Sequence, residues 1–228
     1  MSDNTIAVEI KGLRFAYKKY KPLLEVNELT IFKGEKVFFY GPSGSGKTTL
    51  LGIIAGILPC HTGTIRILGN DFSKCTAKER DKIRGTHMGY IFQLFNLIPY
   101  LTVLENIVLP AKLNPKKGKQ FNAHGLELEA ISLAERLGIE TILEKKVSEI
   151  SVGQSQRVAA ARALLGSPSL IIADEPTSAL DQDTGEQFIK NLFEQCEIQN
   201  TTLIFVSHDK HLLPYFQKRI SLVELNRV

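Results

Sequence analysis

The sequence contains no long apolar run. Its longest apolar stretch, at 53–58, is interrupted by Gly56 and is far shorter than the roughly 18 residues that indicate a membrane span. The opening residues, MSDNTIAVEIKG, also lack a basic segment followed by an apolar one, so nothing marks the chain for export. We therefore expect a cytoplasmic location, and we expect any role at a membrane to come through a partner.

Cysteine is scarce, and the three residues Cys60, Cys75 and Cys196 show no CxxC spacing. An odd number of widely spaced cysteines argues against both a disulfide framework and a zinc site. The net charge of +4 is mild, and the one dense basic patch, at 112–119, is more typical of a solvated loop than of a contact with anionic lipid headgroups. The length of the chain favours one folding unit over 1–228.

Short β-type runs fill the first 40 residues, and a glycine loop then precedes an apolar-periodic helix at about 47–58. The pattern is mainly helical between about 94 and 167. After Pro168 it returns to buried strands, with a helix at about 183–196 between them. Strands that alternate with helices predict a largely parallel α/β sheet.

These patterns predict an α/β fold with a P-loop NTPase core of the RecA-like type. An antiparallel β subdomain is expected at the N-terminus, and an α-helical subdomain is expected to be inserted into the core. The approximate boundaries are 1–93 and 168–228 for the nucleotide-binding core and 94–167 for the helical part.

The segment GPSGSGKT, which begins at Gly41, satisfies the phosphate-loop pattern GxxxxGK[ST] in full. It follows an apolar strand and precedes a helix, so backbone N–H groups and the positive end of the helix dipole are expected to surround phosphate oxygens. Lys47 is expected to reach the β- and γ-phosphates, and Thr48 to ligate Mg²⁺. The nucleotide-binding residues expected in this region are Gly41, Ser43, Gly44, Ser45, Gly46, Lys47, Thr48 and Thr49.

A second motif, SLIIADEP, reads as a buried strand that ends in two carboxylates. Asp174 lies at the carboxyl end of the strand, where α/β sheets hold ligands, and is placed to bind Mg²⁺ through water. Glu175 follows directly and is well placed to orient or deprotonate an attacking water. Hydrolysis of a nucleotide is therefore favoured over transfer to a second substrate.

With four more motifs in the same order, the chain resembles the nucleotide-binding subunit of an ABC transporter over nearly its whole length. The further motifs are a Q-loop at Gln93, a signature at ISVGQ, a D-loop at SALD and the histidine of SHD. The resemblance implies ATP and Mg²⁺ as cofactors, catalytic roles for Glu175, His208 and Gln93, and Mg²⁺ ligation by Thr48, Gln93 and Asp174. It also implies that adenine stacks on Tyr17, although a core role for Tyr17, with Tyr20 nearby, stays open.

In this family the signature of one subunit contacts the ATP held by its twin. The resemblance thus implies an ATP-bound homodimer in which Ser151, Gly153 and Gln154 contact the partner's nucleotide and Asp181 lies at the interface. A helix N-terminus with a hydroxyl and free N–H groups is an anion site, which agrees with this role. Val152 replaces the usual glycine, so either its side chain turns away from the nucleotide or it weakens closure and slows turnover.

The segment from 80 to 110 resembles the branch of lipoprotein-release, macrolide- and peptide-export, and cell-division ATPases. This resemblance implies a membrane permease that docks at the Q-loop and the helical subdomain. It places the chain peripherally at the cytoplasmic face of a bacterial inner membrane. A polar amino-acid importer ATPase and a regulatory ABC ATPase with weak turnover stay open as alternatives. A nontransport role is disfavoured, since such proteins carry two ATPase units or large insertions, and no nucleic-acid partner is expected.

Overall fold

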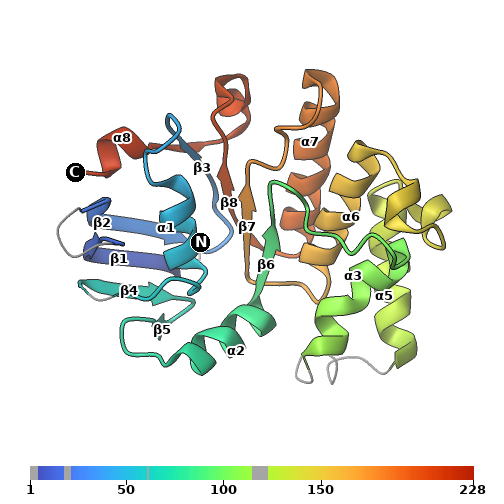
Figure 1. The fold of residues 1–228 in the computed structure, drawn as a ribbon, viewed down its shortest axis with the longest axis horizontal. Helices are drawn as coiled ribbons and strands as arrows, with labels where there is room; N and C mark the ends of the chain where they lie inside the picture. The colour runs from blue at the N-terminus through green and yellow to red at the C-terminus, as the bar shows by residue number, and fades with distance from the viewer. Residues whose placement is uncertain (1–4, 18–21, 61, 115–122) are drawn as a thin grey trace.

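A parallel sheet lies at the centre of the fold, with its strands in the order β6-β7-β8-β3-β9 (Figure 1). The computed structural model describes residues 5–17, 22–60, 62–114 and 123–228. The neighbouring strands all pair in parallel, so every strand ends at the same edge of the sheet. The strands are β3 (Lys36–Tyr40), β6 (Met88–Ile91), β7 (Leu170–Asp174), β8 (Thr202–Val206) and β9 (Lys218–Ser221).

Side chains of the central strands alternate between two apolar clusters, one on each face of the sheet. Phe38 and Phe205 pack into the cluster that contains the apolar faces of the later helices. Phe39 and Ile204, their neighbours in sequence, pack into the cluster that contains the first helix and the N-terminal strands. Because both faces are covered, the strands consist of almost continuous apolar residues, as is usual in parallel sheets.

An antiparallel sheet in the order β2-β1-β4-β5 packs near α1 (Lys47–Ile54), on one side of the parallel sheet (Figure 1). Its long strands show the alternating burial of a sheet with one covered face. The predicted N-terminal antiparallel subdomain is therefore present. The strands are β1 (Ile6–Phe15), β2 (Leu24–Phe32), β4 (Thr64–Ile67) and β5 (Asn70–Asp71).

Helices gather at the other side of the parallel sheet, as the sequence predicts for 94–167 (Figure 1). They are α3 (Val103–Leu113), α5 (Ala123–Arg136) and α6 (Val152–Leu164), followed after β7 by α7 (Gln182–Ile198). The described residues also include 3₁₀ helices, with η1 (Glu140–Ile142) and η2 (Val147–Glu149) between α5 and α6, and η3 (Lys210–Tyr215) between β8 and β9. The α/β P-loop fold is confirmed, whereas the exact division into core and helical parts stays a prediction.

Some elements differ from the sequence prediction. Helix α1 ends at Ile54 rather than near residue 58, because Gly56 has a left-handed backbone with φ of 69°. Helix α2 (Ala77–His87), edge strand β9 and α8 (Leu222–Leu225) were not predicted. Helix α2 has no buried residue, so an apolar-periodicity criterion misses it, although Thr76 and Glu79 form a capping box at its start. Among the described residues no helix has the length and apolarity needed to cross a bilayer.

Candidate functional site

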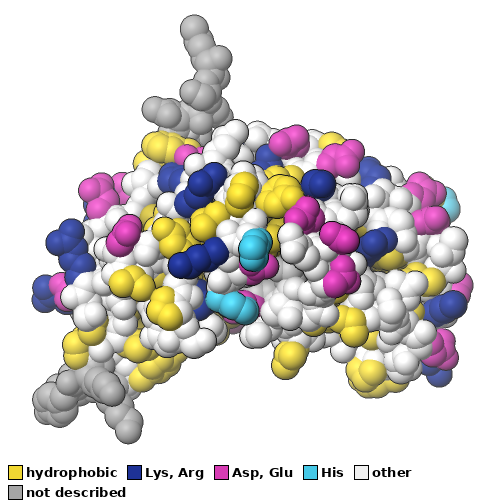
Figure 2. Space-filling model, turned by 90° about the horizontal axis from the view of Figure 1, so that it is seen from above, with side chains coloured by type: hydrophobic (Ala, Val, Ile, Leu, Met, Phe, Trp, Pro, Cys, Tyr) yellow, Lys and Arg dark blue, Asp and Glu magenta, His cyan; other side chains and the backbone are white. Residues whose placement is uncertain are grey.

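Three predicted motifs meet at the edge where the parallel strands end. β3 leads into the phosphate loop, β7 ends at Asp174, and His208 follows β8. Figure 2 looks down on this face, where histidine and acidic side chains gather near the middle. A cleft of about 400 Å³ opens here, and Leu23 is part of its wall. The predicted site residues that line it are Ser43, Gly44, Gly46, Lys47, Thr48, Thr49, Gln93, Asp174, Glu175 and His208.

The phosphate loop has the backbone geometry that an anion cradle requires. Gly44 and Gly46 have φ of 83° and 94°, a region that side chains other than glycine rarely adopt. Gly46 caps α1, so the N-terminal end of this helix, with its unpaired N–H groups, faces the cleft. The buried Oγ of Ser45 has no hydrogen-bond partner among the described residues. These features fit the phosphates of a nucleotide.

Lys47 lies between the phosphate loop and the carboxylate of Glu175. Its Nζ donates to the carbonyl oxygens of Gly41 at 2.7 Å and Pro42 at 3.0 Å. The same atom is 3.9 Å from Oε1 of Glu175, and both side chains are about one-tenth exposed. A positive charge is thus held at the floor of the cleft, where it can bind phosphate oxygens.

Glu175 and His208 form a close pair at the rim. Oε2 of Glu175 lies 2.5 Å from Nδ1 of His208, which fixes the direction of the carboxylate. The backbone of Glu175 is left-handed, with φ of 50°, although a proline follows it. Glutamate rarely adopts this conformation, and strained backbone of this kind is concentrated at functional sites.

The environment of Asp174 disfavours the charged form of its carboxyl group. Burial raises the pKa of its carboxyl group, and the charge of Glu175 raises it further, while Lys47 lowers it. A divalent cation would relieve this repulsion between neighbouring carboxylates. Thr48, Gln93 and Asp174 offer a hydroxyl, an amide oxygen and a carboxylate to one cleft, which are the oxygen ligands that Mg²⁺ prefers. The residues present therefore fit Mg²⁺.

The signature and the D-loop meet in a separate depression of about 510 Å³, which shares no lining residue with the first cleft. Oγ of Ser151 accepts from the N–H of Gln154 at 3.2 Å, while Oε1 of Gln154 accepts from the N–H of Ser151 at 2.9 Å. Asp181 caps α7 by accepting from the N–H of Thr184 at 3.0 Å. Gly153 also lines this depression, so the structure groups the residues predicted to contact a partner's nucleotide.

A family profile described as ABC transporter matches residues 24–178. The chain belongs to the ABC transporter family. The cassette is similar to the lipoprotein-releasing system ATP-binding protein LolD of Francisella tularensis subsp. tularensis, with 35% identity over 97% of this chain and 95% of the relative. An uncharacterized ABC transporter ATP-binding protein, YbbA of Escherichia coli K12, is 39% identical over 86% of this chain and 84% of its own.

Solved structures support the same assignment. A dimeric ATP-binding cassette in a post-hydrolysis state, bound to ADP and Pi, superposes with a TM-score of 0.78 and 35% identity. The match covers 94% of this chain and 93% of that one. The predicted family and ATPase activity are confirmed, and this cassette is an ATP-binding and ATP-hydrolysing subunit of an ABC transporter.

The structure places both Val152 and Tyr17 at the surface. Val152 is the first residue of α6, is 52% exposed in the signature depression and does not have a positive φ. No glycine is therefore needed for backbone reasons, and the side chain lines the depression. Tyr17 is 64% exposed, stands edge-on to Phe15 and has its hydroxyl 3.4 Å from Oγ1 of Thr49, so it is not a core residue. Tyr20 lies outside the described residues.

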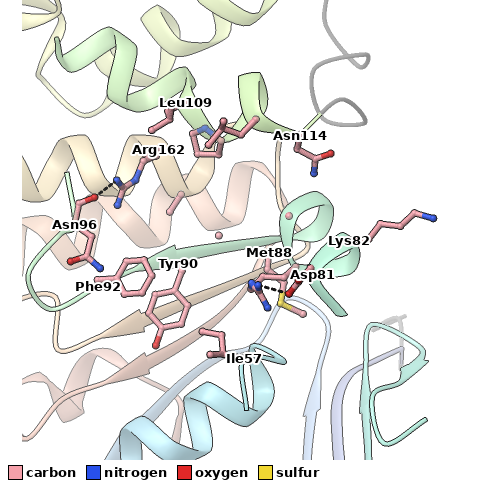
Figure 3. Close-up of a pocket in the computed structure, with 16 residues that line it drawn as sticks. Ile57, Asp81, Lys82, Met88, Tyr90, Phe92, Asn96, Leu109, Asn114 and Arg162 are labelled. Carbon is pink, nitrogen blue, oxygen red and sulfur yellow. Dashed lines mark hydrogen bonds and ion pairs between the residues drawn. The ribbon is translucent and has the colours of Figure 1, made fainter. Parts of the chain in front are cut away.

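A larger groove of about 730 Å³ lies on the other side of the Q-loop, between α2 and α3 (Figure 3). Tyr90 and Phe92 stack at 4.2 Å between ring centroids and line it together with the exposed Ile57 and Leu113. Basic side chains of α2 and Arg162 of α6 complete its wall. Sequence reasoning did not find this groove, because its residues come from four separate elements.

Two polar residues of α6 were also missed. Gln156 is buried among alanines at helical spacing, and its Nε2 donates to the carbonyl oxygen of Pro176 at 2.7 Å. Arg162 donates to the carbonyl oxygen of Asn96 at 2.7 Å (Figure 3) and to that of Phe95 at 2.5 Å. Both acceptor residues have a positive φ. A polar residue on the apolar face of an amphipathic helix was the available sequence signal.

Proposed function

We propose that the cassette drives a membrane permease by closing into a homodimer around two Mg-ATP, and that its work is export or mechanotransmission. The adjacency of Gln93 and Phe92 carries this proposal. Gln93 lines the nucleotide cleft, and Phe92, next to it in the chain, lines the apolar groove. A change in the position of Gln93 on nucleotide binding is therefore transmitted directly to a surface that a partner helix can occupy.

In this proposal the residues of the cleft have different chemical roles. The phosphate loop and Lys47 bind and orient the phosphates, and Thr48, Gln93 and Asp174 hold Mg²⁺. When bound, Mg²⁺ neutralises charge on the transferred phosphoryl group. Glu175, oriented by His208, orients or deprotonates the attacking water. Tyr17 supplies an exposed aromatic face for the adenine.

The location of the signature supports the homodimer. Ser151, Gly153 and Gln154 line a depression of their own, so within one subunit they contribute nothing to the cleft around Lys47. The N-terminus of this helix can bind an anion, but it has no cationic loop beside it. In a homodimer, the phosphates of the ATP held by the twin subunit would supply that anion. Asp181, at the same depression, then lies at the contact between subunits. The dimeric state of a similar solved cassette agrees with this arrangement.

The apolar groove supports the proposal that a permease is the partner. The segment after Gln93 also carries exposed apolar side chains, since Leu94 is 83% exposed and Tyr100 is 72% exposed. Exposed apolar surface is a feature of protein contact sites. Docking of a permease in this groove would place the cassette peripherally at the cytoplasmic face of the membrane. The similarity to LolD, a protein of a lipoprotein-releasing system, favours the export or mechanotransmission branch over a polar amino-acid importer.

A regulatory ATPase with weak turnover is the second candidate, and the exposed Val152 favours it. A β-branched side chain at the signature face keeps the partner's nucleotide at a greater distance than glycine does. Turnover of the isolated cassette and of its complex with the permease separates the two candidates. Low turnover that the permease does not raise supports the regulatory role.

The experiment that tests the proposal is capture of the permease from native membranes. Tagged Glu175→Gln protein in Mg-ATP should hold the closed dimer, and mass spectrometry identifies what copurifies. A permease with few membrane helices and a large extracytoplasmic domain supports the proposal. An importer-type permease supports the importer alternative, and the reproducible absence of any membrane protein contradicts a transporter role.

A matched pair of surface variants tests the groove within the same experiment. Leu113 is 75% exposed and lines the groove, whereas Leu128, 52% exposed on α5, does not. Leu113→Ser should reduce recovery of the permease, and Leu128→Ser should leave it unchanged. Equal recovery with both variants would place the docking site elsewhere.

A further inference from the structure

The turn that carries Glu175 has an unfavourable backbone conformation. Its φ of 50° is left-handed, and Pro176 follows it, which favours extended backbone at position 175. Such a conformation persists only when the surrounding contacts determine it. The direction of the Glu175 carboxylate depends on this backbone, so the contacts that hold the turn also aim the side chain.

Two hydrogen bonds tie the backbone of the turn to other elements of the fold. The N–H of Glu175 donates to the carbonyl oxygen of Val206 at 2.9 Å, which ties the turn to β8. Nε2 of Gln156 donates to the carbonyl oxygen of Pro176 at 2.7 Å. The second bond comes from α6, a helix that belongs to a different part of the chain.

The side chain of Gln156 is poorly explained by packing alone. It is 1% exposed, and its Oε1 has no hydrogen-bond partner within the described residues. A buried carboxamide with an unpaired oxygen is less favourable than an apolar side chain of the same size. Its remaining contribution is the donor that reaches Pro176.

Helix α6 also begins at the signature depression. Ser151 caps it, and Gln156 follows five residues later, at about 7.5 Å along the helix axis at 1.5 Å per residue. One short, rigid segment thus joins the helix start that would face the partner's ATP to the turn that bears Glu175. A shift of this helix moves the donor that holds the turn.

We propose that Gln156 is a positioning residue for Glu175, through which helix α6 sets the direction of the catalytic carboxylate. This inference rests on the proposed role of Glu175 in hydrolysis. Gln156 acts by holding the carbonyl oxygen of Pro176, and it lines neither the nucleotide cleft nor the signature depression.

The deciding variant is Gln156→Met, which keeps the length of the side chain and removes both the donor and the unpaired oxygen. We expect kcat for ATP hydrolysis to fall roughly 10- to 100-fold, as small misplacements of catalytic groups do. Affinity for a nonhydrolysable ATP analogue should stay within about twofold, and the melting temperature should stay the same or rise. The kcat is calculated per molecule of protein that binds nucleotide. A lower melting temperature with unchanged kcat would show a merely structural role for Gln156 and overturn the proposal.

The chain offers a matched control in Gln195 of α7. It is also 1% exposed, and its Oε1 likewise lacks a partner among the described residues. Gln195→Met should leave kcat unchanged, and an equal fall with both variants would contradict a specific role for Gln156. Gln156→Leu is a second variant of the same kind, should methionine not be tolerated in the helix.

A double variant separates failure of this inference from failure of the proposed function. If Gln156 acts through Glu175, then Gln156→Met should not lower the residual turnover of Glu175→Gln further. An additional fall by the same factor as in the wild type overturns the inference. Wild-type turnover in the single variant Glu175→Gln instead overturns the proposed role of Glu175.

Discussion

Oε2 of Glu175 lies 2.5 Å from Nδ1 of His208, although the carboxylate side chain is only 11% exposed and the imidazole is 65% exposed. The histidine therefore covers the carboxylate from the solvent side, while Lys47 approaches it from the interior. The carboxylate is held between two basic groups, and its remaining freedom is small.

This pair leads to the first prediction. Glu175→Gln should lower kcat for ATP hydrolysis by at least about 100-fold, since general-base groups contribute roughly 10²- to 10⁴-fold. Binding of ATP should persist, because the phosphate loop and Lys47 are intact. His208→Ala should lower kcat less, since Glu175 remains in the cleft. Single-turnover hydrolysis and equilibrium ATP binding check both variants, and full activity in Glu175→Gln would refute the assignment.

The second prediction concerns Asp174 and pH. Burial raises the pKa of its carboxyl group, with Glu175 as the second cause. A raised pKa in the folded state means that the carboxyl stabilises the fold fully below its unfolded pKa of about 3.9 and that this contribution is lost as pH rises through the folded value. At neutral pH without Mg²⁺, the charged carboxylate therefore destabilises the protein.

Asp174→Asn should accordingly raise the melting temperature at pH 7 in the absence of Mg²⁺, while hydrolysis of Mg-ATP is lost. The gain should shrink as pH falls through the raised pKa of Asp174, because the wild-type carboxyl then takes up a proton. Thermal unfolding across this pH range measures the effect. A variant that is less stable than the wild type at every pH would contradict the electrostatic account.

The third prediction concerns the signature. Because Val152 is exposed at the signature depression, Val152→Gly should ease closure of the dimer and raise turnover about fivefold, equivalent to about 1 kcal/mol. The variant should lower the stability of the monomer slightly, since glycine disfavours helix. ATP-dependent dimerisation of a Glu175→Gln background measures closure directly. Unchanged dimerisation and turnover would show that the valine is accommodated.

The fourth prediction concerns Arg162, whose guanidinium holds the carbonyl oxygens of Phe95 and Asn96. Burial lowers the pKa of Arg162, yet arginine stays charged at neutral pH. Lysine does not reproduce the fork of donors, so Arg162→Lys should cost about 1.5–3 kcal/mol, with a fall in melting temperature of about 2–4 °C per kcal/mol.

A matched control for this change is Arg157→Lys on the same helix. The guanidinium of Arg157 makes one long contact, 3.5 Å to the carbonyl oxygen of Leu137, so its replacement should cost less than about 0.5 kcal/mol. Equal losses in the two variants would show that the bonds to Phe95 and Asn96 contribute little.

The sequence predicted which residues meet in the cleft, because each motif couples a residue type to a backbone shape. Gly44 and Gly46 permit a left-handed loop, and an apolar strand that ends in Asp174 places the carboxylate at the edge of the sheet. Spacing alone establishes these features. The left-handed backbone of Glu175 had no such signal, since glutamate before proline normally favours an extended conformation.

Features that depend on distant parts of the chain were not accessible in the same way. The bond from Gln156 to Pro176 joins residues that are 20 positions apart and becomes visible only when α6 packs against the parallel sheet at β6. Strand β9, with the sequence KRIS, lacks an apolar run because it lies at the edge of the sheet. Its hydrogen-bonded pairing with β3 defines it as a strand, which its composition alone does not predict.

The alternation of Phe38 and Phe39 between two clusters has a mechanical consequence. The parallel sheet acts as a wall between two packing compartments, one beneath the phosphate loop and the other beneath the helices that carry the signature. Helices on one face can tilt by rearranging the contacts of their own compartment, while α1 keeps its support on the opposite face. The signature helices can therefore move against the sheet while the phosphate loop keeps its support on the opposite face.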